Sequence, residues 1–441
     1  MLDFYENNNR ECNGSKMVKK NDIYNFCKEI FPINRSITGK GVCDTLKIIQ
    51  REIPNLTVHH VPTGERCFDW TIPKEWNVTE AYIITPDGDK ICNFNSNNLH
   101  LMGYSAPVNL TIELEDLEKH LHSLPDLSNA IPYITSYYHE NWGFCISHNE
   151  RKLLKKGKYK VFIDSALTQG FLTYGELLIK GKTKEEVFFS TYICHPSMGN
   201  NETSGPAVTT YLSKYIQSMP SPYYSYRVIF IPETIGSIAY LSKNLDEMKK
   251  NIISGFNITC VGDNNNYSYM PSRDGGTLSD KVAKHILKNQ VQKFKEYSFL
   301  ERGSDERQYC YPGVDLPVCS VMRTKYGEYE EYHTSLDDLN FISADGLNGA
   351  YEAHIKMINA LEKNRTYINT MLCEPQLGKR GMYPNVSTKL TKSTVQTMMN
   401  LLTYCDGSMD LISIAELIKK PIWDLYELVG DLEMKGIIKR R

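Results

Sequence analysis

Apolar and polar positions follow three different patterns along the chain, and each pattern predicts a different kind of structure. Residues 24–31 and 42–53 carry apolar residues at helical spacing on either side of a Gly-containing turn, so we predict two helices. Between about Val58 and Ser147 the pattern changes to short alternating runs, which predict strands. Residues 80–94 fit a hairpin, because Pro-Asp-Gly-Asp separates two such runs.

From about Lys158 onward, continuous apolar runs alternate with helical patterns. The predicted strands cover residues 158–167, 170–181, 185–196, 226–233 and 253–263, and the predicted helices cover 204–219 and 236–250. Continuous apolar strands that alternate with helices indicate a largely parallel sheet covered by helices on both faces. The β-rich stretch interrupts this α/β unit after its first helices, so we expect it to form an inserted domain.

The pattern changes a third time after about Asn364. Residues 395–441 fit the order helix, turn, short helix, helix and strand, with Pro421 in the turn and Gly436 as a helix C-cap. This order predicts a winged-helix domain.

A winged helix often binds DNA, but the charges of this one favour another role. The candidate recognition helix, residues 422–436, carries Asp424, Glu427, Asp431 and Glu433 against a single lysine. Phosphates would repel such a helix, because phosphate contacts dominate affinity for DNA. We therefore expect packing, self-association or a protein partner, and no nucleic acid.

Composition narrows the class of protein further. The chain has 441 residues, enough for two or three domains, and a formal net charge of -2, so no overall field favours nucleic acid or an anionic membrane. The first twenty residues lack the apolar core of a secretory signal, and no run approaches the length of a membrane span. The twelve cysteines show no CxxC spacing, so we expect reduced thiols in a cytoplasmic protein.

Three reactive side chains follow three predicted strands. His195, Glu233 and Asp263 stand at or just beyond the strands that precede them. Each has an ordinary explanation, as a hydrogen-bonded buried histidine, a helix-capping acid and a turn residue. Ligands of an open α/β sheet bind beyond the carboxyl ends of its strands, so together these residues indicate a site.

A fourth segment, residues 327–339, adds a second imidazole. His333 stands between Tyr332 and Thr334, and the alternative is a surface histidine in an acidic loop. A hydrolytic zinc needs nitrogen or oxygen ligands, an open position and a carboxylate base outside the ligand set. His195, Glu202 and His333 could supply the ligands, and Glu233 the base.

The order of these elements resembles the aminopeptidase-like superfamily of zinc exopeptidases. The shared features are a histidine at a strand end, a Gly/Ser turn that opens a helix, a glutamate at the next strand end, a late Ser-Asp loop and a His-Thr pair. Residues 131–148, 194–206 and 302–313 resemble a bacterial branch of this superfamily, and the resemblance covers nearly the whole chain.

The resemblance implies three parts. They are an α/β domain with a zinc-exopeptidase-like mixed sheet covered by helices (1–60 and 158–364), an inserted mostly-β domain (61–157) and a C-terminal winged-helix domain (365–441).

The chain departs from the two-zinc pattern of that superfamily. Asn201 stands where relatives place a bridging aspartate, Thr234 follows Glu233 where they place a ligand glutamate, and Thr259 stands where they place another aspartate. Neutral side chains replace anionic ligands poorly, so we predict one zinc ion. Asp263 could hold the metal ligands in position without binding the metal itself.

Residues 302–308 offer charged groups for a substrate. Arg307 could pair with a carboxylate or polarise a carbonyl, and Asp305 could bind a free amine or hold a metal ligand. The alternative for Asp305, Glu306 and Arg307 is a structural salt bridge. Tyr332, with Tyr326 and Tyr329, could line the pocket or simply pack.

Two functions remain open from the sequence. The first is a zinc-dependent hydrolase that cleaves a peptide or a related amide bond, including a sugar amide, with Glu233 as general base. The second is a catalytically decayed peptidase-like binding protein that acts through its insert and its winged helix.

Overall fold

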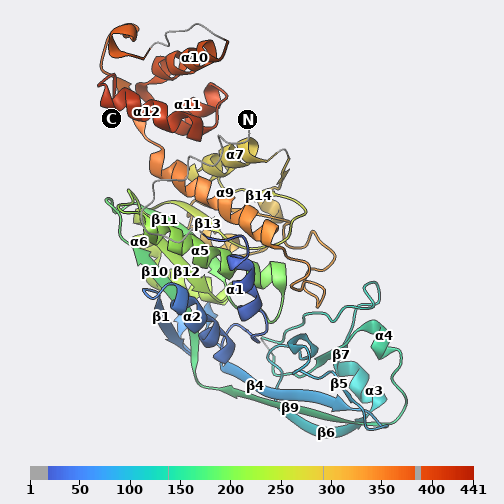
Figure 1. Cartoon of the computed structure of the whole chain (residues 1–441). Coiled ribbons are helices and arrows are strands. Elements are labelled where there is room, and N and C mark those ends of the chain that lie inside the picture. The colour runs from blue at the N-terminus through green and yellow to red at the C-terminus, as the bar shows by residue number, and fades with distance from the viewer. Residues whose placement is uncertain (1–17, 138, 292, 383–388) are drawn as a thin grey trace. The chain divides into compact units, whose positions relative to one another are not determined.

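The computed structural model describes residues 18–137, 139–291, 293–382 and 389–441 (Figure 1). Most of the N-terminal stretch that was examined for a secretory signal lies outside these residues. The described chain forms two compact units. The first unit runs to Gly275 and includes Lys295–Tyr351, and the second consists of Gly276–Phe294 and Glu352–Arg441.

An eight-stranded mixed sheet forms the centre of the first unit. Its strands, in spatial order, are β1 (Thr57–Pro62), β10 (Phe171–Ile179), β12 (Ser225–Ile231), β11 (Glu186–Tyr192), β13 (Ile252–Asn257), β16 (Val318–Met322), β14 (Ser268–Met270) and β15 (Lys295–Glu296). The four central strands β12, β11, β13 and β16 are parallel to one another. The strands β1 and β10 pair antiparallel with their neighbours, and β14 pairs antiparallel with β16 and parallel with β15. The predicted mixed sheet is therefore confirmed.

Every residue of β11 is buried, which explains why its sequence is a continuous apolar run. The helices of this unit are α1 (Asp22–Ile30), α2 (Lys40–Glu52), α5 (Ser204–Ser218), α6 (Ile235–Asn251), the short α8 (Glu306–Tyr309) and the start of α9 (Ala344–Lys363). The helix α5 packs on α1, α2 and β11, and the predicted helices are thereby confirmed.

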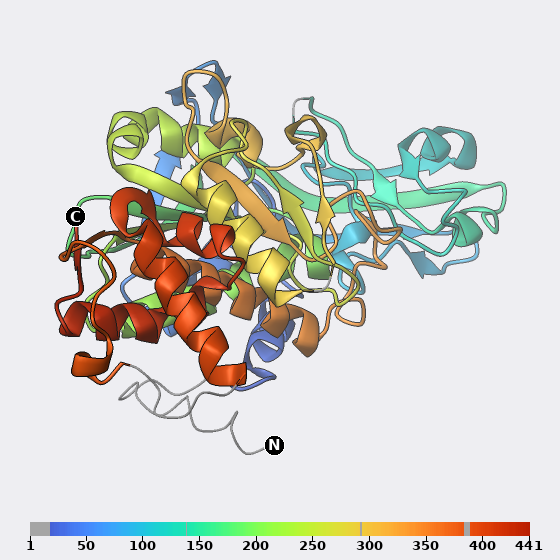
Figure 2. The same ribbon diagram turned by 90° about the horizontal axis from the view of Figure 1, so that it is seen from above.

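The β-rich region forms a separate four-stranded sheet within the first unit, drawn in blue and teal in Figures 1 and 2. Its strands, in spatial order, are β5 (Lys90–Ile91), β4 (Glu75–Ile84), β9 (Lys158–Thr168) and β6 (Val108–Glu113). The predicted hairpin joins β4 to β5, and its turn is closed by the amide of Thr85, which donates to the carbonyl of Asp89 at 2.9 Å.

The apolar run at 158–167 is therefore a strand of the four-stranded sheet and not of the eight-stranded one. Its residues are buried alternately at first, as expected for a strand with one covered face. The remaining elements of this region are β2 (Arg66–Cys67), β3 (Trp70–Thr71), α3 (Leu114–Leu117), β7 (Leu121–His122), β8 (Phe144–Cys145) and α4 (His148–Arg151). The exact limits of an inserted domain stay a prediction.

The second unit contains the predicted winged helix. Its elements are α7 (Leu278–Gln290), the end of α9, β17 (Thr366–Asn369), α10 (Lys389–Tyr404), β18 (Asp406–Asp410), α11 (Leu411–Leu417), α12 (Tyr426–Met434) and β19 (Ile438–Arg440). The strands form a small sheet in the order β18-β17-β19. Gly436 ends α12 with a φ of 64°, the conformation for which a C-cap glycine is suited.

The imidazole of His285 joins α7 to the winged helix. Its Nδ1 lies 2.5 Å from Glu416, and its Nε2 accepts the backbone N–H of Ile422 at 2.9 Å.

Among the described residues, no helix is both long and apolar enough to cross a membrane. The described cysteines are free thiols.

Candidate active site

Loops at the carboxyl end of the central parallel strands surround a cavity of about 840 Å³. His195 follows β11 and Glu233 follows β12, and both side chains line this cavity together with His333. The Nε2 atom of His195 lies 3.8 Å from an Oε atom of Glu233, and the two imidazole ring centres are 5.6 Å apart. The fold thus brings together three of the residues that the sequence singled out.

A buried carboxylate fixes the orientation of His195. The Nδ1 atom of His195 lies 2.9 Å from Oε2 of Glu202, and the His195 side chain is almost fully buried. Because Nδ1 is occupied by this contact, Nε2 is the ring nitrogen that faces Glu233. Histidine ligands of metals are commonly held in this way, with a carboxylate on the nitrogen that does not bind the metal.

The second oxygen of Glu202 pairs with Arg35. The Nε atom of Arg35 donates to Oε1 of Glu202 at 3.0 Å and to the backbone carbonyl of His195 at 3.1 Å. One terminal nitrogen of Arg35 donates to the carbonyl of Ile30 at 2.5 Å, while its other terminal nitrogen is buried without a partner among the described residues. Arg35 and Glu202 are 1% and 0% exposed, so this ion pair lies in the protein interior.

The surroundings of His195 change the pKa of its imidazole. Burial alone would lower its pKa, but contacts with Cys194 and Glu202 outweigh burial and raise the pKa of His195 well above its usual range. Cys194 is the nearest sulfur, and burial raises the pKa of its thiol to about 11. Cys194 is therefore a neutral thiol near pH 7 and a weak metal ligand.

Glu233 is held at the cavity wall by neutral groups. The hydroxyl of Ser304 donates to its Oε1 at 2.7 Å, and its backbone amide donates to the sulfur of Cys194 at 3.2 Å. Burial raises the pKa of Glu233, against the opposing effects of His195 and Ser304. The next residue, Thr234, has a φ of 62°, a left-handed conformation that non-glycine residues rarely adopt and that often marks functional sites.

His333 enters the cavity on a loop that the inserted region braces. Tyr133 donates its backbone N–H to the carbonyl of His333 at 2.8 Å, and its ring contacts both imidazoles edge-on, with ring centres 5.2 Å from His333 and 5.3 Å from His195. Tyr332 stacks on His333 at 3.9 Å. Burial and the charge of His195 lower the pKa of His333 to about 3, so this imidazole is neutral.

The charged residues predicted in the loop 302–308 divide into an arginine at the cavity and two buried acids. Arg307 lines the cavity and donates to the Thr234 hydroxyl at 2.9 Å and to the Ser304 carbonyl at 3.0 Å. Asp305 is buried behind Glu233, where burial and the charge of Glu233 raise its pKa to about 7. Glu306 is buried too, and it accepts the Tyr326 hydroxyl at 2.6 Å.

Asn201 and Asp263 lie outside the cavity lining. Asp263 accepts the N–H and the hydroxyl of Thr324 at 2.8 and 2.7 Å and an amide N–H of Asn200 at 3.1 Å. Asn201 accepts the hydroxyl of Tyr192 at 3.2 Å, and its own amide nitrogen is buried without a partner among the described residues. These contacts hold the turn between β11 and α5.

Four residues that organise the site were not identified from the sequence. They are Arg35, Tyr133, Ser304 and Asp337. Asp337 accepts the backbone N–H groups of Asn200 and Asn201 at 2.6 and 2.9 Å and thereby anchors the same turn. Asp337 lies in the acidic segment after His333, and Tyr133 and Ser304 lie in segments that carry the family resemblance, although no role was predicted for them. Arg35 comes from a loop with no distinctive pattern.

Two donor sets of the described residues could hold a metal ion. Ligand atoms of Cys194, His195 and Glu202 lie within 4.8 Å of one another, but this set is buried beside Arg35, whose positive charge opposes a second cation. The donors that face the cavity are His195 Nε2 and the imidazole of His333, and Glu233 lies beside them. Imidazole nitrogens are preferred zinc ligands, so these two histidines could hold this ion while Glu233 stays outside the ligand set.

Removing the charge of Arg35 should destabilise the first unit strongly. In an Arg35→Met variant, Glu202 would remain as a buried and uncompensated carboxylate, and we expect a loss of about 3–5 kcal/mol in the free energy of unfolding. Chemical denaturation measures this loss. The control is Arg51→Met, which removes an exposed ion pair with Glu29 and should cost no more than about 1 kcal/mol. Equal losses in the two variants would contradict the importance of the buried pair.

The buried carboxyl of Asp337 should make stability depend on pH. Burial raises the pKa of Asp337 to about 7, against opposing hydrogen bonds from the amides of Asn200 and Asn201. In the unfolded chain an aspartate has a pKa of about 3.9, so the folded state retains a proton that the unfolded state releases. Its stabilising effect is present below about pH 4 and is lost as the pH rises to about 7, a change of about 4 kcal/mol.

Urea denaturation of the wild type and of Asp337→Asn tests this at several pH values. Between about pH 4 and pH 7, the free energy of unfolding of the wild type should fall relative to that of the variant. Above about pH 7, the difference between the two proteins should stay constant. A stability difference that stays constant over this range would contradict the shifted pKa.

Comparisons with known proteins identify the two parts of the chain. Residues 24–364 match the family model described as "Domain of unknown function (DUF4910)", and residues 365–440 match one described as "winged helix-turn-helix". A protein of Clostridium acetobutylicum, named as a candidate polysaccharide biosynthesis protein with an aminopeptidase-like domain, is 44% identical over 396 residues, which cover 89% of this chain and 90% of that protein.

Two solved structures place the fold. The crystal structure of a candidate peptidase from Clostridium acetobutylicum superposes with a TM-score of 0.90 and 42% identity over 96% of each chain. A zinc aminopeptidase from Bacillus subtilis shares the fold, with a TM-score of 0.56 and 13% identity over 78% of this chain and 94% of that one. The chain therefore belongs to the DUF4910 family and combines an aminopeptidase-like fold with a C-terminal winged helix.

Proposed function

We propose that this protein is a zinc-dependent hydrolase that cleaves a peptide or a related amide bond, with Glu233 as general base. The observation that carries the proposal is the shared cavity of His195, His333 and Glu233, with 3.8 Å between His195 Nε2 and a Glu233 carboxylate oxygen. The aminopeptidase-like fold agrees with this chemistry.

We propose that one zinc ion is held by His195 through Nε2 and by His333. From the sequence we predicted Glu202 as a third zinc ligand. Both oxygens of Glu202 contact protein groups, Arg35 and His195 Nδ1, so we now give Glu202 the role of orienting and polarising His195. Such supporting carboxylates raise the basicity of the histidine that they hold.

A bound zinc ion would lower the pKa of a water molecule enough to make it a nucleophile near neutral pH. The side chains of this protein would carry out the proton transfers. Glu233 accepts the proton of that water and later donates it to the departing amine, a role for which a buried carboxylate with a raised pKa is suited. Ser304 holds the other oxygen of Glu233 and so fixes the direction of proton transfer.

Arg307 and the aromatic wall would bind the substrate. The guanidinium of Arg307 lines the cavity and can pair with a substrate carboxylate or polarise the carbonyl that is attacked. Trp70, Tyr133 and Tyr137 of the inserted region line the same cavity and offer flat apolar faces. A peptide fits this lining, and so does an amide carried by a sugar, a substrate class in keeping with the name of the Clostridium acetobutylicum relative.

For the winged helix we propose a role in contacts with protein, either a partner or a second copy of the chain. The segment 422–434 carries four acidic residues and no basic one, and Glu433 forms an ion pair with Arg440 of β19. Such a surface opposes the phosphates of nucleic acid.

Metal content and turnover together test the proposed reaction. Protein purified without chelator should contain about one equivalent of zinc, measured by plasma mass spectrometry. Its activity on a panel of aminoacyl, carboxypeptidase and N-acyl-sugar substrates should fall about 10²- to 10⁴-fold in Glu233→Gln, because the base is removed. The zinc content of that variant should stay unchanged.

The matched control is Glu185→Gln, the same substitution at an exposed position before β11. It should retain full activity. A wild type that lacks zinc and turns over none of the substrates would support the binding-protein alternative, and turnover that survives Glu233→Gln would rule out Glu233 as the base.

A second experiment separates the two roles considered for Glu202. The double variant Arg35→Met/Glu202→Gln removes both buried charges and leaves neither unpaired. If Glu202 orients His195, zinc affinity should fall about 10- to 100-fold and binding should remain measurable. If Glu202 is a direct ligand, competition with a chelator should show the same loss of zinc as in His333→Ala.

A further inference from the structure

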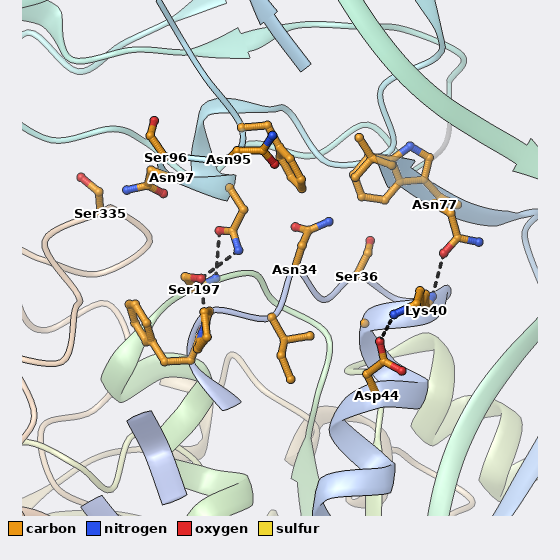
Figure 3. Close-up of a pocket in the computed structure, with 18 of the residues that line it drawn as sticks. Asn34, Ser36, Lys40, Asp44, Asn77, Asn95, Ser96, Asn97, Ser197 and Ser335 are labelled. Carbon is orange, nitrogen blue, oxygen red and sulfur yellow. Dashed lines mark hydrogen bonds and ion pairs between the residues drawn. The ribbon is translucent and has the colours of Figure 1, made fainter. Parts of the chain in front are cut away.

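A second cavity, of about 580 Å³, lies in the first unit (Figure 3). Its walls come from the loop between α1 and α2, the start of β4, the segment 94–98 and the loops that follow His195 and His333. None of the residues that line it lines the catalytic cavity. Nothing in the proposed hydrolytic reaction uses it.

Small neutral polar groups dominate this cavity. It is lined by five asparagines, Asn34, Asn77, Asn95, Asn97 and Asn98, and by four serines. An asparagine amide offers both donors and an acceptor, and a serine hydroxyl offers one donor and two lone pairs. The aromatic residues Trp76 and Phe94 add an apolar part to the same wall.

Some of these polar groups hold the wall together. Asn98 donates to the Ser197 hydroxyl at 2.8 Å, and Ser197 in turn donates to the carbonyl of Phe31 at 2.7 Å. The side-chain oxygen of Asn77 accepts the backbone N–H of Lys40 at 2.7 Å and so caps the start of α2. These contacts join the inserted region to the loops of the catalytic domain.

Three polar side chains at the cavity form no side-chain hydrogen bond within the described protein. Asn34, Ser36 and Asn95 have no side-chain hydrogen bond to any described residue, although Ser36 is only 5% exposed and Asn34 is half-buried. In Figure 3 the side chains of Asn34 and Ser36 project into the open space, with Asn95 across from them. These three side chains can therefore donate and accept hydrogen bonds to a ligand in the cavity without breaking a contact within the protein.

The cavity lining carries few charged groups. Among the described lining residues, the charged side chains are Lys40, Asp44 and Asp338. Lys40 forms an ion pair with Asp44, and the carboxylate of Asp338 accepts the backbone N–H groups of Asn340 and Phe341 at 2.7 and 3.1 Å. Most of the polar groups that a ligand meets here are therefore neutral.

The wall that carries Asn34 is rigid. A β-carbon at Gly41 would lie 1.9 Å from the carbonyl oxygen of Asn34, and one at Gly39, where φ is +96°, would lie 2.1 Å from the carbonyl oxygen of Trp76. The loop between α1 and α2 therefore lies against the first turn of α2 and the start of β4 at a distance that only glycine permits. A wall fixed in advance lowers the entropic cost of binding a ligand.

We propose that this cavity binds a neutral saccharide. Each hydroxyl of a sugar ring can both donate and accept, which matches the asparagine and serine groups, and the C–H face of a ring can lie against Phe94 and Trp76. A nucleotide or phosphorylated ligand would find only Lys40, which already pairs with Asp44, whereas the neutral groups that a sugar needs are many. The inference is independent of the proposed hydrolase activity.

Isothermal titration of the full-length protein with chitobiose, cellobiose and maltose tests the proposal, with inorganic phosphate and a tetra-alanine peptide as comparison probes. At least one disaccharide should bind to the wild type. Asn34→Ala and Asn95→Ala should each weaken that binding about ten-fold, because each removes a hydrogen bond to the ligand. Asn95 is exposed, so its substitution leaves the packing of the unit intact.

Two controls locate the binding. Asn55→Ala changes an exposed asparagine that lines neither cavity, and Glu233→Gln changes the catalytic cavity alone; both should bind the disaccharide as the wild type does. The proposal is overturned if no disaccharide binds, if only the peptide or phosphate binds, or if binding is lost in Glu233→Gln and retained in Asn34→Ala.

Discussion

The buried ion pair between Arg35 and Glu202 is the interaction on which the arrangement of the site depends. Arg35 ties the loop after α1 to the turn after β11, and it compensates the charge of a carboxylate that is 0% exposed. Glu202 is thereby held in the interior, where its other oxygen contacts Nδ1 of His195. The other ring nitrogen is thereby directed to the cavity and to Glu233. The position of the reactive imidazole is thus decided by a guanidinium that never reaches the cavity.

The inserted region is the second constraint, because it supports the other histidine. Ile131 and Tyr133 form backbone hydrogen bonds with Ser335 and His333, and the Tyr133 ring lies against both imidazoles. The β-rich region therefore forms part of the wall of the cavity that contains both histidines. The same loops also separate the two cavities: Ser197 and Ser335 stand two residues beyond His195 and His333 and line the polar cavity. A saccharide bound there would lie next to the proposed hydrolytic centre.

Much of this architecture could be predicted from sequence, for reasons that are local. The strand β11 is buried on all sides, so its apolar run and the loop that ends it stand out, and His195, Glu233 and His333 could be placed at a common edge before any coordinates. The strand β9 could not be assigned to the correct sheet in this way. Its apolar run suits either sheet, and only its pairing with β4 and β6 assigns it to the inserted one. The same limit applies to Asp263, which follows a strand as expected but lies outside the cavity, among Thr324 and Asn200.

The sequence by itself determined the order of elements, the mixed α/β class, the winged helix and the residues that end the central strands, because apolar periodicity and turn residues act over short distances along the chain. Only the tertiary structure decided which side chains of the site form hydrogen bonds and ion pairs with one another. The partners of Glu202 are Arg35, 167 residues away, and His195, 7 residues away, and the partner of His333 is Tyr133 in the insert. No periodic pattern encodes such pairs, since they depend on how separate loops meet at one edge of the sheet and on the cost of leaving a buried charge alone.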